Sequence, residues 1–481
     1  MTTTLKHKII SGVFWQGLER FGSQGLSFGI SIVLARLLAP EEFGVLAIML
    51  VFVSISAVFV DSGFSVALIQ KRDLDDIDCS SVFYLNIGIS ILLYGLLFFC
   101  AGPIGEFYND ESIRFLLRIL GIILVIRSFS LVQSALLNKR MLFQLSFKIS
   151  WTALIISGAV GIVMAYCGCG VWALIVQQLL NAVVTGIMLW LLVKWRPQAI
   201  FNFERMKSLF RFGGKMFCSG LLDTIYNNIY SILIGRLFSL TTLSFYNRGS
   251  SIPALVMGSI NSTIGSVALP AFSQLQDEPA HIRKLAQRSL KTIMFLISPM
   301  LALLLIFATP LVRIILTDKW LPCVIFLQLN CLIFLFWPLH TMNLQIIIAC
   351  GRGNILLALE MIKKIQLVLM ILLTYRYGVT AMVWGLVATG PLSFVENAWF
   401  NRKLIAYSPW QQFLDILPIW IVTVIAGVFS FWVGEMFYNP WIQISIGGMV
   451  FAFVYLTAGG IGKIFPIDIM QLMKNRLFQY E

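Results

Sequence analysis

Apolar runs of about twenty residues recur along the whole chain, and they constrain its fold more than any other feature. Counting them gives fourteen candidate membrane spans between residues 9 and 462. A helix of about twenty residues is long enough to cross the hydrocarbon core of a bilayer. Hydrophobic residues make up 59% of the 481 residues and charged residues only 12%, far from the balance of soluble domains. The sequence therefore predicts an all-α integral membrane protein with about 14 transmembrane helices.

A second copy of the N-terminal sequence pattern begins near residue 208. The end of the first span is repeated in the seventh, and the tetrapeptide SVAL recurs in the segment that follows each of them. The matched positions are Ser31, Ile32, Arg36 and Leu37 with Ser231, Ile232, Arg236 and Leu237, and Ser65–Leu68 with Ser266–Leu269. Internal duplication in a membrane chain is typical of transporters. We therefore expect two homologous halves.

The repeat predicts three parts of the chain. Spans 1–6 form an N-lobe at residues 1–200, spans 7–12 form a C-lobe at 201–405, and spans 13–14 with a C-terminal tail are appended at 406–481. Each lobe has an even number of spans, so both have the same orientation in the membrane. We expect the two six-helix lobes to be related by a pseudo-two-fold axis along the membrane normal. The segment Lys194–Ser208, the longest charged connection, is the predicted linker between them.

The formal net charge of +13 is distributed unevenly between the two sides of the membrane. Lys and Arg concentrate on the loops that share a side with the N-terminus, such as Lys71 and Arg72 and the group Lys194–Lys215. The positive-inside rule places both termini in the cytoplasm. This topology explains the basic charge without a nucleic-acid partner. The opposite loops are short, so none can fold into an external catalytic domain.

Several classes of cofactor and processing are excluded by the residues present. Most of the eight cysteines lie inside apolar runs, and with three histidines and no C-x-x-C they form no zinc or haem set, so we expect no metal site. Glu19 and Arg20 interrupt the first apolar stretch and no cleavage site follows, which argues against a cleaved signal peptide. No phosphate-binding G-x-x-x-x-G-K-[ST] loop is present, so direct ATP drive is not expected.

Several motifs resemble the polysaccharide, or O-antigen, flippases of the multidrug/oligosaccharidyl-lipid/polysaccharide exporter superfamily. They begin with GVFWQGLERFGSQGLSFGISIVLARLLAPEEFGVLA and FVDSGFSVALIQKRD. Further matches are RFGGKMFCSGLLDTIYNNIYSILIGRLF, SFYNRGSSIPALVMGSINSTIGSVALPAFSQLQ and ACGRGN. Within the superfamily the chain is most similar to the colanic-acid-exporter branch, and the resemblance covers its whole length.

The resemblance implies a function and a setting. Two six-helix lobes would face each other across a central cavity in the bacterial inner membrane and work by alternating access. The cargo would be an undecaprenyl-diphosphate-linked oligosaccharide, flipped from the cytoplasmic to the outer leaflet for surface polysaccharide biosynthesis. The protein would be a transporter and not an enzyme. Membrane lipids and the glycosyltransferases and polymerase of the same pathway would be its partners, and a monomer is expected.

Ionisable residues at membrane depth are the informative ones, because each costs free energy unless it faces a cavity or a partner. Arg20 and Arg248 are the first choice for holding the cargo diphosphate, since guanidinium groups bind phosphate bidentately and both lie in spans that line the cavity in the family. For Arg20 the alternative is a structural ion pair with Glu19 or Asp61. For Arg248 it is snorkelling to the outer interface. The remaining cavity residues are Glu19, Arg127 and Lys215, with a topology anchor as the favoured role of Lys215.

The other polar and aromatic residues have structural explanations of similar weight. Asp61 and Asp223 could accept protons or coordinate a sodium ion that drives transport, and pairing at helix ends explains them equally well. Lys363 with Glu360 is expected to be a satisfied pair on one helix. Aromatic residues near the predicted boundaries are expected to be mostly interface anchors; they are Phe238, Trp320, Trp410 and Trp441.

Two other functions remain open at this stage. An ion-coupled multidrug exporter of the same superfamily would be expected to have twelve spans, and the motifs are closer to the polysaccharide branch. A membrane polysaccharide polymerase or ligase would be expected to expose a large outward loop with catalytic Arg or His. No outward loop of the predicted topology contains a histidine.

Overall fold

The computed structural model describes residues 2–61, 63–71 and 73–461, and within these ranges every regular element is a helix. The predicted all-α class is confirmed. The helices in chain order are α1 (Thr2–Leu37), α2 (Pro40–Asp61), α3 (Phe64–Gln70), α4 (Asp76–Tyr108), α5 (Ser112–Leu120), α6 (Ile122–Ser128), α7 (Leu131–Lys139), α8 (Phe143–Tyr166), α9 (Val171–Leu192), α10 (Phe203–Leu237), α11 (Leu240–Ser273), α12 (Pro279–Ile306), α13 (Ala308–Ile315), η1 (Asp318–Cys323), α14 (Val324–Leu335), α15 (Trp337–Ala349), α16 (Gly353–Thr374), η2 (Tyr375–Tyr377), α17 (Val379–Ile405), α18 (Pro409–Glu435) and α19 (Pro440–Ile461).

The described helices support a chain that crosses the membrane many times. Nine of them are long and apolar enough to span a bilayer, and the bent segment α5–α7 raises the number to ten. Four more helices, α1, α10, α11 and α16, are 36, 35, 34 and 22 residues long. Of these, α1, α10 and α16 carry several charged residues and α11 carries one, Arg248. They are long enough to cross as well, so the predicted fourteen spans are compatible with the structure.

The order of elements in the second half of the chain repeats that of the first. The 36-residue α1 corresponds to the 35-residue α10, and both end with an arginine in the last turn, Arg36 and Arg236. The short amphipathic helix α5 corresponds to α13. One difference follows each first helix: α2 and α3 are separated at Gly63, whose φ is 72°, whereas α11 is continuous. The repeated order supports the duplication, and the axis that would relate the halves stays a prediction.

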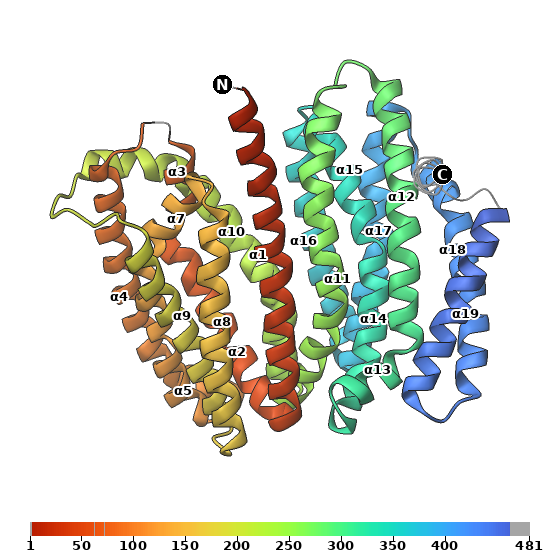
Figure 1. Ribbon diagram of the computed structural model, residues 1–481, viewed down its shortest axis with the longest axis horizontal. Helices are drawn as coiled ribbons and strands as arrows, with labels where there is room; N and C mark the ends of the chain where they lie inside the picture. Colours follow the sequence, from red (N-terminus) through yellow and green to blue (C-terminus); the bar gives the residue numbers. More distant parts are fainter. Residues whose placement is uncertain (1, 62, 72, 462–481) are drawn as a thin grey trace. The chain divides into compact units, whose positions relative to one another are not determined.

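The chain divides into two compact units, residues 1–244 and 245–481. In the first unit α1 packs along α8 and α8 along α9 (Figure 1). The helix α10 also belongs to this unit, because it packs on α2, and the rings of Phe59 and Phe217 meet with centroids 5.0 Å apart. The lobe boundary near residue 200, which comes from the sequence repeat, stays a prediction.

Among the described glycines of the first unit, Gly44 of α2 leaves the least room for a side chain. A Cβ atom there would lie 1.9 Å from the carbonyl oxygen of Leu240. No side chain fits into that distance, so only glycine allows α2 to touch the backbone at the start of α11.

The segment that connects α9 to α10 is fastened to the first unit along its length. The indole N–H of Trp195 donates to Asp76 at 3.1 Å, and the backbone N–H of Gln198 donates to the Ser80 hydroxyl at 3.0 Å. Four residues later the N–H of Asn202 donates to Ser81 at 3.0 Å. The predicted linker is therefore a strap held on the N-terminal end of α4.

Asp78 of α4 is fully buried and interacts with two cations, Lys71 and Arg205. Its Oδ2 accepts a hydrogen bond from Lys71, and its Oδ1 lies 3.7 Å from the guanidinium of Arg205. Arg205 also pairs with Asp75, which caps α4 in a reciprocal capping box with Asp78. The hydrogen bonds from Arg205 and from the N–H of Asp78 lower the pKa of Asp75 from 3.8 to about 2.

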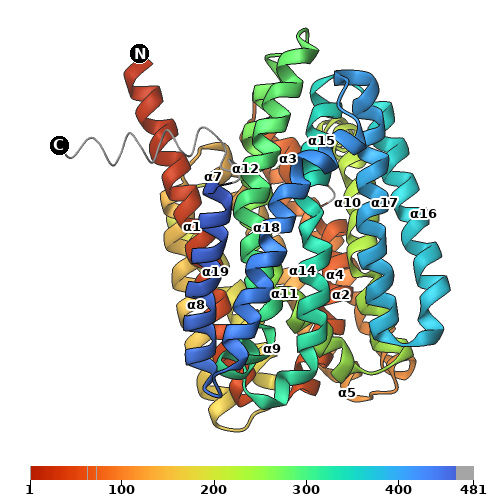
Figure 2. The same cartoon turned by 90° about the vertical axis from the view of Figure 1, so that its right-hand side faces the viewer.

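In the second unit the last two helices pack as a pair, with α18 and α19 side by side (Figures 1 and 2). The helix α18 is joined to the rest of this unit by buried amides. Gln412 donates to Asn343 at 3.0 Å and accepts from it at 2.9 Å, and Asn401 donates to the same Asn343 oxygen at 2.6 Å. Because buried polar groups need such partners, these three side chains fix α15, α17 and α18 against one another.

Candidate functional site

A polar pocket lies among the helices of the first unit, and we call it the Arg127 pocket. Its volume is about 320 Å³, and its walls come from α3, α6, α7 and α9 and the residues between them. The polar side chains on its wall are Ser65, Arg127, Ser130, Ser134, Asn138, Asn181 and Thr185. This concentration of hydrogen-bonding groups marks a place where a polar group can be solvated inside the protein.

The pocket exists because the fourth predicted span is bent. The axes of α5–α6 and α7 differ by 46° at the residues Phe129 and Ser130. The Ser130 hydroxyl donates to the Arg127 carbonyl at 3.1 Å, and Ser128 is hydrogen-bonded to Ser90 of α4 at 2.9 Å. These bonds satisfy polar groups at the bend, as a break in a membrane helix requires. The bend brings Arg127 to the pocket wall.

Asp61, the last residue of α2, is connected to this pocket through Ser65. Both the backbone N–H and the hydroxyl of Ser65 donate to the Asp61 carboxylate, and Ser65 lines the pocket. Two of the ionisable residues predicted to be functional, Arg127 and Asp61, thus border one polar region. The alternative role for Asp61 was pairing with nearby basic residues at the helix end, whereas its described hydrogen bonds come from Ser65.

Glu19 and Arg20 lie on α1 in the same unit. The Ser150 hydroxyl of α8 donates to Glu19 at 3.1 Å, and the Arg20 side chain is exposed. Within the described residues Arg20 forms no ion pair with Glu19 or Asp61. The structural pairing that competed with a cargo role for Arg20 is therefore absent from the described part of the chain.

Arg248 lies in the second unit and is buried. Its side chain is 8% exposed, and its guanidinium lies 5.1 Å from the ring centre of Trp320. Trp320 is completely buried, with Phe245 packed edge-on against it at 5.9 Å. Most of the aromatic residues near the predicted boundaries were expected to be interface anchors, and Trp320 is an exception because its ring is covered by these two side chains. Phe238, Trp410 and Trp441 are exposed, as interface residues are expected to be.

The remaining two predicted site residues lie on α10. Asp223 is exposed. Lys215 belongs to the helix, but its side chain lies outside the described residues. Five of the seven predicted residues, namely Glu19, Arg20, Asp61, Arg127 and Asp223, have described side chains in the first unit, and Arg248 is in the second. No group of three or more potential metal ligands occurs among the described residues.

A second polar cluster, in unit two, was not predicted as a functional group. Nδ1 of His340 on α15 lies 3.3 Å from the Asn397 amide on α17, and Glu396, the residue before Asn397, accepts a hydrogen bond from Gln366 of α16. The expected pair of Lys363 with Glu360 is confirmed, at 3.2 Å. The occurrence of His340 and Glu396 inside apolar runs was the signal that could have indicated this cluster.

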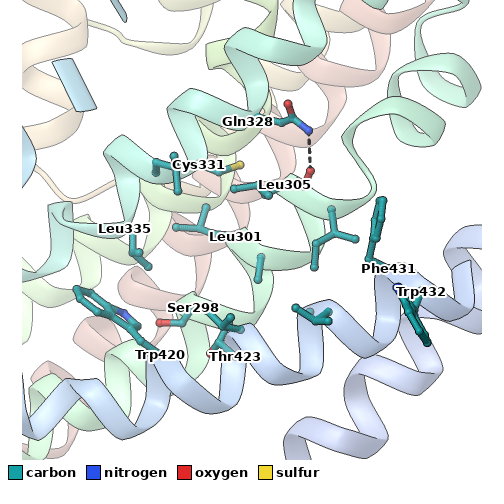
Figure 3. A pocket seen from close by; sticks show the side chains of 16 residues that line it. Ser298, Leu301, Leu305, Gln328, Cys331, Leu335, Trp420, Thr423, Phe431 and Trp432 are labelled. Atoms are coloured by element: carbon teal, nitrogen blue, oxygen red, sulfur yellow. Dashed lines mark hydrogen bonds between the residues drawn. The ribbon is translucent and has the colours of Figure 1, made fainter. Parts of the chain in front are cut away.

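The second unit also has an apolar groove, shown in Figure 3. It lies between α12, α14 and α18 and has a volume of about 560 Å³. Apolar side chains form most of its wall, including those of Leu301, Leu335 and Trp432. Gln328 is one of the few polar residues, and its amide is turned to the carbonyl of Leu305 at 3.2 Å. A hydrocarbon chain can lie in such a groove without desolvating polar groups.

Comparison with known proteins agrees with this architecture. A family of polysaccharide biosynthesis proteins matches residues 33–325. The chain belongs to this family. The resemblance inferred from the sequence motifs is confirmed.

Characterised polysaccharide biosynthesis proteins are similar over most of the chain. The teichuronic acid biosynthesis protein TuaB of Bacillus subtilis (strain 168) is 25% identical over 440 residues, which is 89% of each chain. The succinoglycan biosynthesis transport protein ExoT of Rhizobium meliloti (strain 1021) is 27% identical over 66% of this chain and 65% of its own. The lipopolysaccharide biosynthesis protein WzxC of Escherichia coli (strain K12) is 21% identical over 87% and 85%.

Solved structures with the same fold are transporters. The lipid II flippase MurJ in an inward closed conformation superposes with a TM-score of 0.75 and 16% identity, and the match covers 95% of this chain and 99% of MurJ. An inward-facing multidrug resistance transporter of the MATE family gives a TM-score of 0.62 at 16% identity, over 80% of this chain and 94% of its own. The match to MurJ therefore covers more of this polysaccharide biosynthesis protein than the match to the MATE transporter does, and it shows a shared fold.

Proposed function

We propose that this protein moves an undecaprenyl-diphosphate-linked oligosaccharide from the cytoplasmic to the outer leaflet of the bacterial inner membrane, for the synthesis of a surface polysaccharide. It does so without covalent chemistry, by alternating access. The observation that carries the proposal is that a member of a polysaccharide biosynthesis family has the fold of a flippase over 95% of its length.

The chemistry of the cargo is matched by two features of the chain. A lipid-linked oligosaccharide has a charged, hydroxyl-rich head and a long hydrocarbon tail. The Arg127 pocket offers a cation and hydroxyl and amide groups, which replace the water around a diphosphate or a sugar. The apolar groove of the second unit offers a surface for hydrocarbon.

Arg127 is our choice for the residue that contacts the cargo head in the first unit, since it lines a pocket. Arg20 and Glu19 on α1, together with Lys215 on α10, are proposed as further contacts along the path. Arg248 remains a proposed diphosphate ligand, although its burial beside Trp320 also suits a structural role.

The finer features of the transport cycle belong to the same proposal. Asp61 and Asp223 are the proposed sites of proton or sodium coupling. Both termini are cytoplasmic, the lobes are 1–200 and 201–405 with an appended pair at 406–481, and the protein works as a monomer. The glycosyltransferases and the polymerase of the same pathway supply and consume its cargo.

The test is complementation in a strain that lacks the gene. Without the protein, the complete lipid-linked oligosaccharide should accumulate on the cytoplasmic side while the surface polysaccharide is lost. Arg127→Ala should restore export poorly and Arg127→Lys partly, because lysine keeps the charge but loses the bidentate fork. The matched control is Arg140→Ala, which removes an exposed arginine at the end of α7 that does not line the pocket.

Two results would contradict the proposal. If the deletion strain exported normal polysaccharide but became sensitive to cationic drugs, the protein would be a multidrug exporter. If the deletion strain accumulated single repeat units on the outer leaflet, the protein would act as a polymerase or ligase.

A further inference from the structure

The second unit has another cavity, whose wall carries a cation and aromatic rings. A cavity of about 620 Å³ lies where α17 ends and α18 begins. Its wall consists of Val395, Trp399, Arg402, Ala406, Ser408, Pro409, Trp410 and Gln411. A volume of this size is in the range of pockets for organic ligands, about 300–1,000 Å³, and exceeds what a single ion needs.

The cavity changes in character with depth, because four of its residues lie on one face of α17. Val395, Trp399, Arg402 and Ala406 follow one another at intervals of three or four positions, which is the spacing of a single helical face. With a rise of 1.5 Å per residue, Arg402 lies about 10 Å nearer the end of the helix than Val395. One end of the cavity is therefore apolar and the other cationic.

In the part of the chain that the structure describes, the cation of this cavity, Arg402, has no acidic partner. The Arg402 side chain is exposed, and its guanidinium lies 5.8 Å from the ring centre of Trp399. Within the described ranges it forms no ion pair, and none of the eight residues that line the cavity is acidic. In contrast, Arg205 and Lys291 each pair with an aspartate. Arg402 is thus available for an anion from outside the chain.

The two tryptophans on the wall are unusually exposed for such large rings. Trp399 is 52% exposed and Trp410 is 66% exposed, and Trp410 stacks on Phe413 at 5.6 Å. Exposed tryptophan at the end of a membrane span is typical of the headgroup level of a bilayer. An interface anchor alone requires neither a cavity nor an arginine on the same wall, so the combination indicates a bound molecule.

We propose that this cavity binds one anionic phospholipid of the leaflet on its side of the membrane, with the phosphodiester on Arg402 and an acyl chain along Trp399 and Val395. Charge complementarity selects this occupant, because a lipid phosphate is anionic and Arg402 forms no ion pair with any described residue. The apolar depth of the cavity selects a lipid over a free phosphate ion. The bound lipid fills the junction between the second half of the chain and its appended helices α18 and α19.

The test uses the full-length purified protein, titrated with dioleoyl phosphatidylglycerol or dioleoyl phosphatidylcholine and observed by native mass spectrometry. Wild type should bind one phosphatidylglycerol more tightly than the rest, and phosphatidylcholine should show no such tight adduct. Arg402→Gln should weaken the tight binding about fivefold or more, the effect of one arginine on an anionic lipid. Trp410→Ala should also weaken it, because it removes one wall.

The matched control is Lys403→Gln, which removes a neighbouring exposed cation that does not line the cavity. It should leave the tight phosphatidylglycerol adduct unchanged. Both charge variants should melt at the wild-type temperature in lipid-free detergent, so that a loss of binding is not a loss of folding. Equal weakening by Lys403→Gln and Arg402→Gln would overturn the proposal in favour of a diffuse basic surface. Displacement of the lipid by millimolar inorganic phosphate would overturn it in favour of an ion site.

Discussion

Removing Lys71 should destabilise the protein more than removing its buried partner Asp78. Asp78 is completely buried, whereas the Lys71 and Arg205 side chains are 35% and 38% exposed. Loss of the carboxylate leaves two cations that can turn to water. Loss of Lys71 leaves a buried carboxylate whose nearest cation is Arg205 at 3.7 Å, beyond hydrogen-bond distance.

The magnitudes follow from this asymmetry. Breaking a buried pair by removing one partner costs about 3–5 kcal/mol, and because Arg205 still faces the carboxylate we expect about 2–3 kcal/mol for Lys71→Met. Asp78→Asn loses charge-assisted bonds but keeps the shape of the side chain, at about 1–2 kcal/mol. The double variant removes the stranded charge as well. The double variant should therefore lose no more stability than Asp78→Asn alone. In other words, Asp78→Asn should rescue the protein from the effect of Lys71→Met.

The assay is thermal unfolding of the purified variants in one detergent at neutral pH. Lys71→Met should have the lowest melting temperature, and the double variant should melt close to Asp78→Asn. Additive effects in the double variant would refute the electrostatic explanation, because additivity means that the two side chains act independently. An unchanged melting temperature for Lys71→Met would show that Asp78 is solvated or protonated in the native protein.

Three further predictions concern topology, pH and transport. An engineered cysteine at Asn109 should react with an impermeant thiol reagent in intact cells and one at Gln198 should be protected; the reverse pattern would invert the proposed orientation. The pKa of Asp75 is lowered to about 2, so the stability that its ionised carboxylate contributes is present above pH 3.8 and is lost as the pH falls towards 2. Asp75→Asn should therefore reduce the dependence of the melting temperature on pH in this range. Arg20→Ala and Arg248→Ala should each weaken cargo binding roughly ten- to a hundredfold if they hold the diphosphate, measured as polysaccharide export at matched membrane levels; wild-type export by both variants would assign them structural roles.

The helical architecture and the family could be read from the sequence because both depend on local information. Runs of apolar residues report the length of a membrane span wherever its neighbours lie. The repeat of Arg36 as Arg236 was also visible, and both arginines occupy the last turn of a long first helix in their half. Motifs that mark the family are contiguous stretches, so they needed no tertiary structure.

The environment of each side chain could not be read in this way. Trp320 follows an outward loop in the sequence, and only the packing of Arg248 and Phe245 over its ring reveals that it is buried. The Arg127 pocket depends on a bend of 46° after α6, and no proline or glycine marks that bend. The linker likewise looks like a charged connection and no more until its hydrogen bonds to the start of α4 are known.

The close contact between Gly44 and the Leu240 carbonyl means that a small substitution at position 44 can force two helices apart. A single added methyl group cannot coexist with the described arrangement, since it would lie 1.9 Å from the carbonyl oxygen. The variant Gly44→Ala must therefore hold α2 away from the start of α11, whereas Gly29→Ala on α1 meets no atom within 4 Å. Any conformer of the transport cycle in which α2 and the start of α11 have separated would accept the methyl group without strain. One substitution could thus bias the protein toward that conformer, and crystals or cryo-EM samples of the variant would be enriched in it.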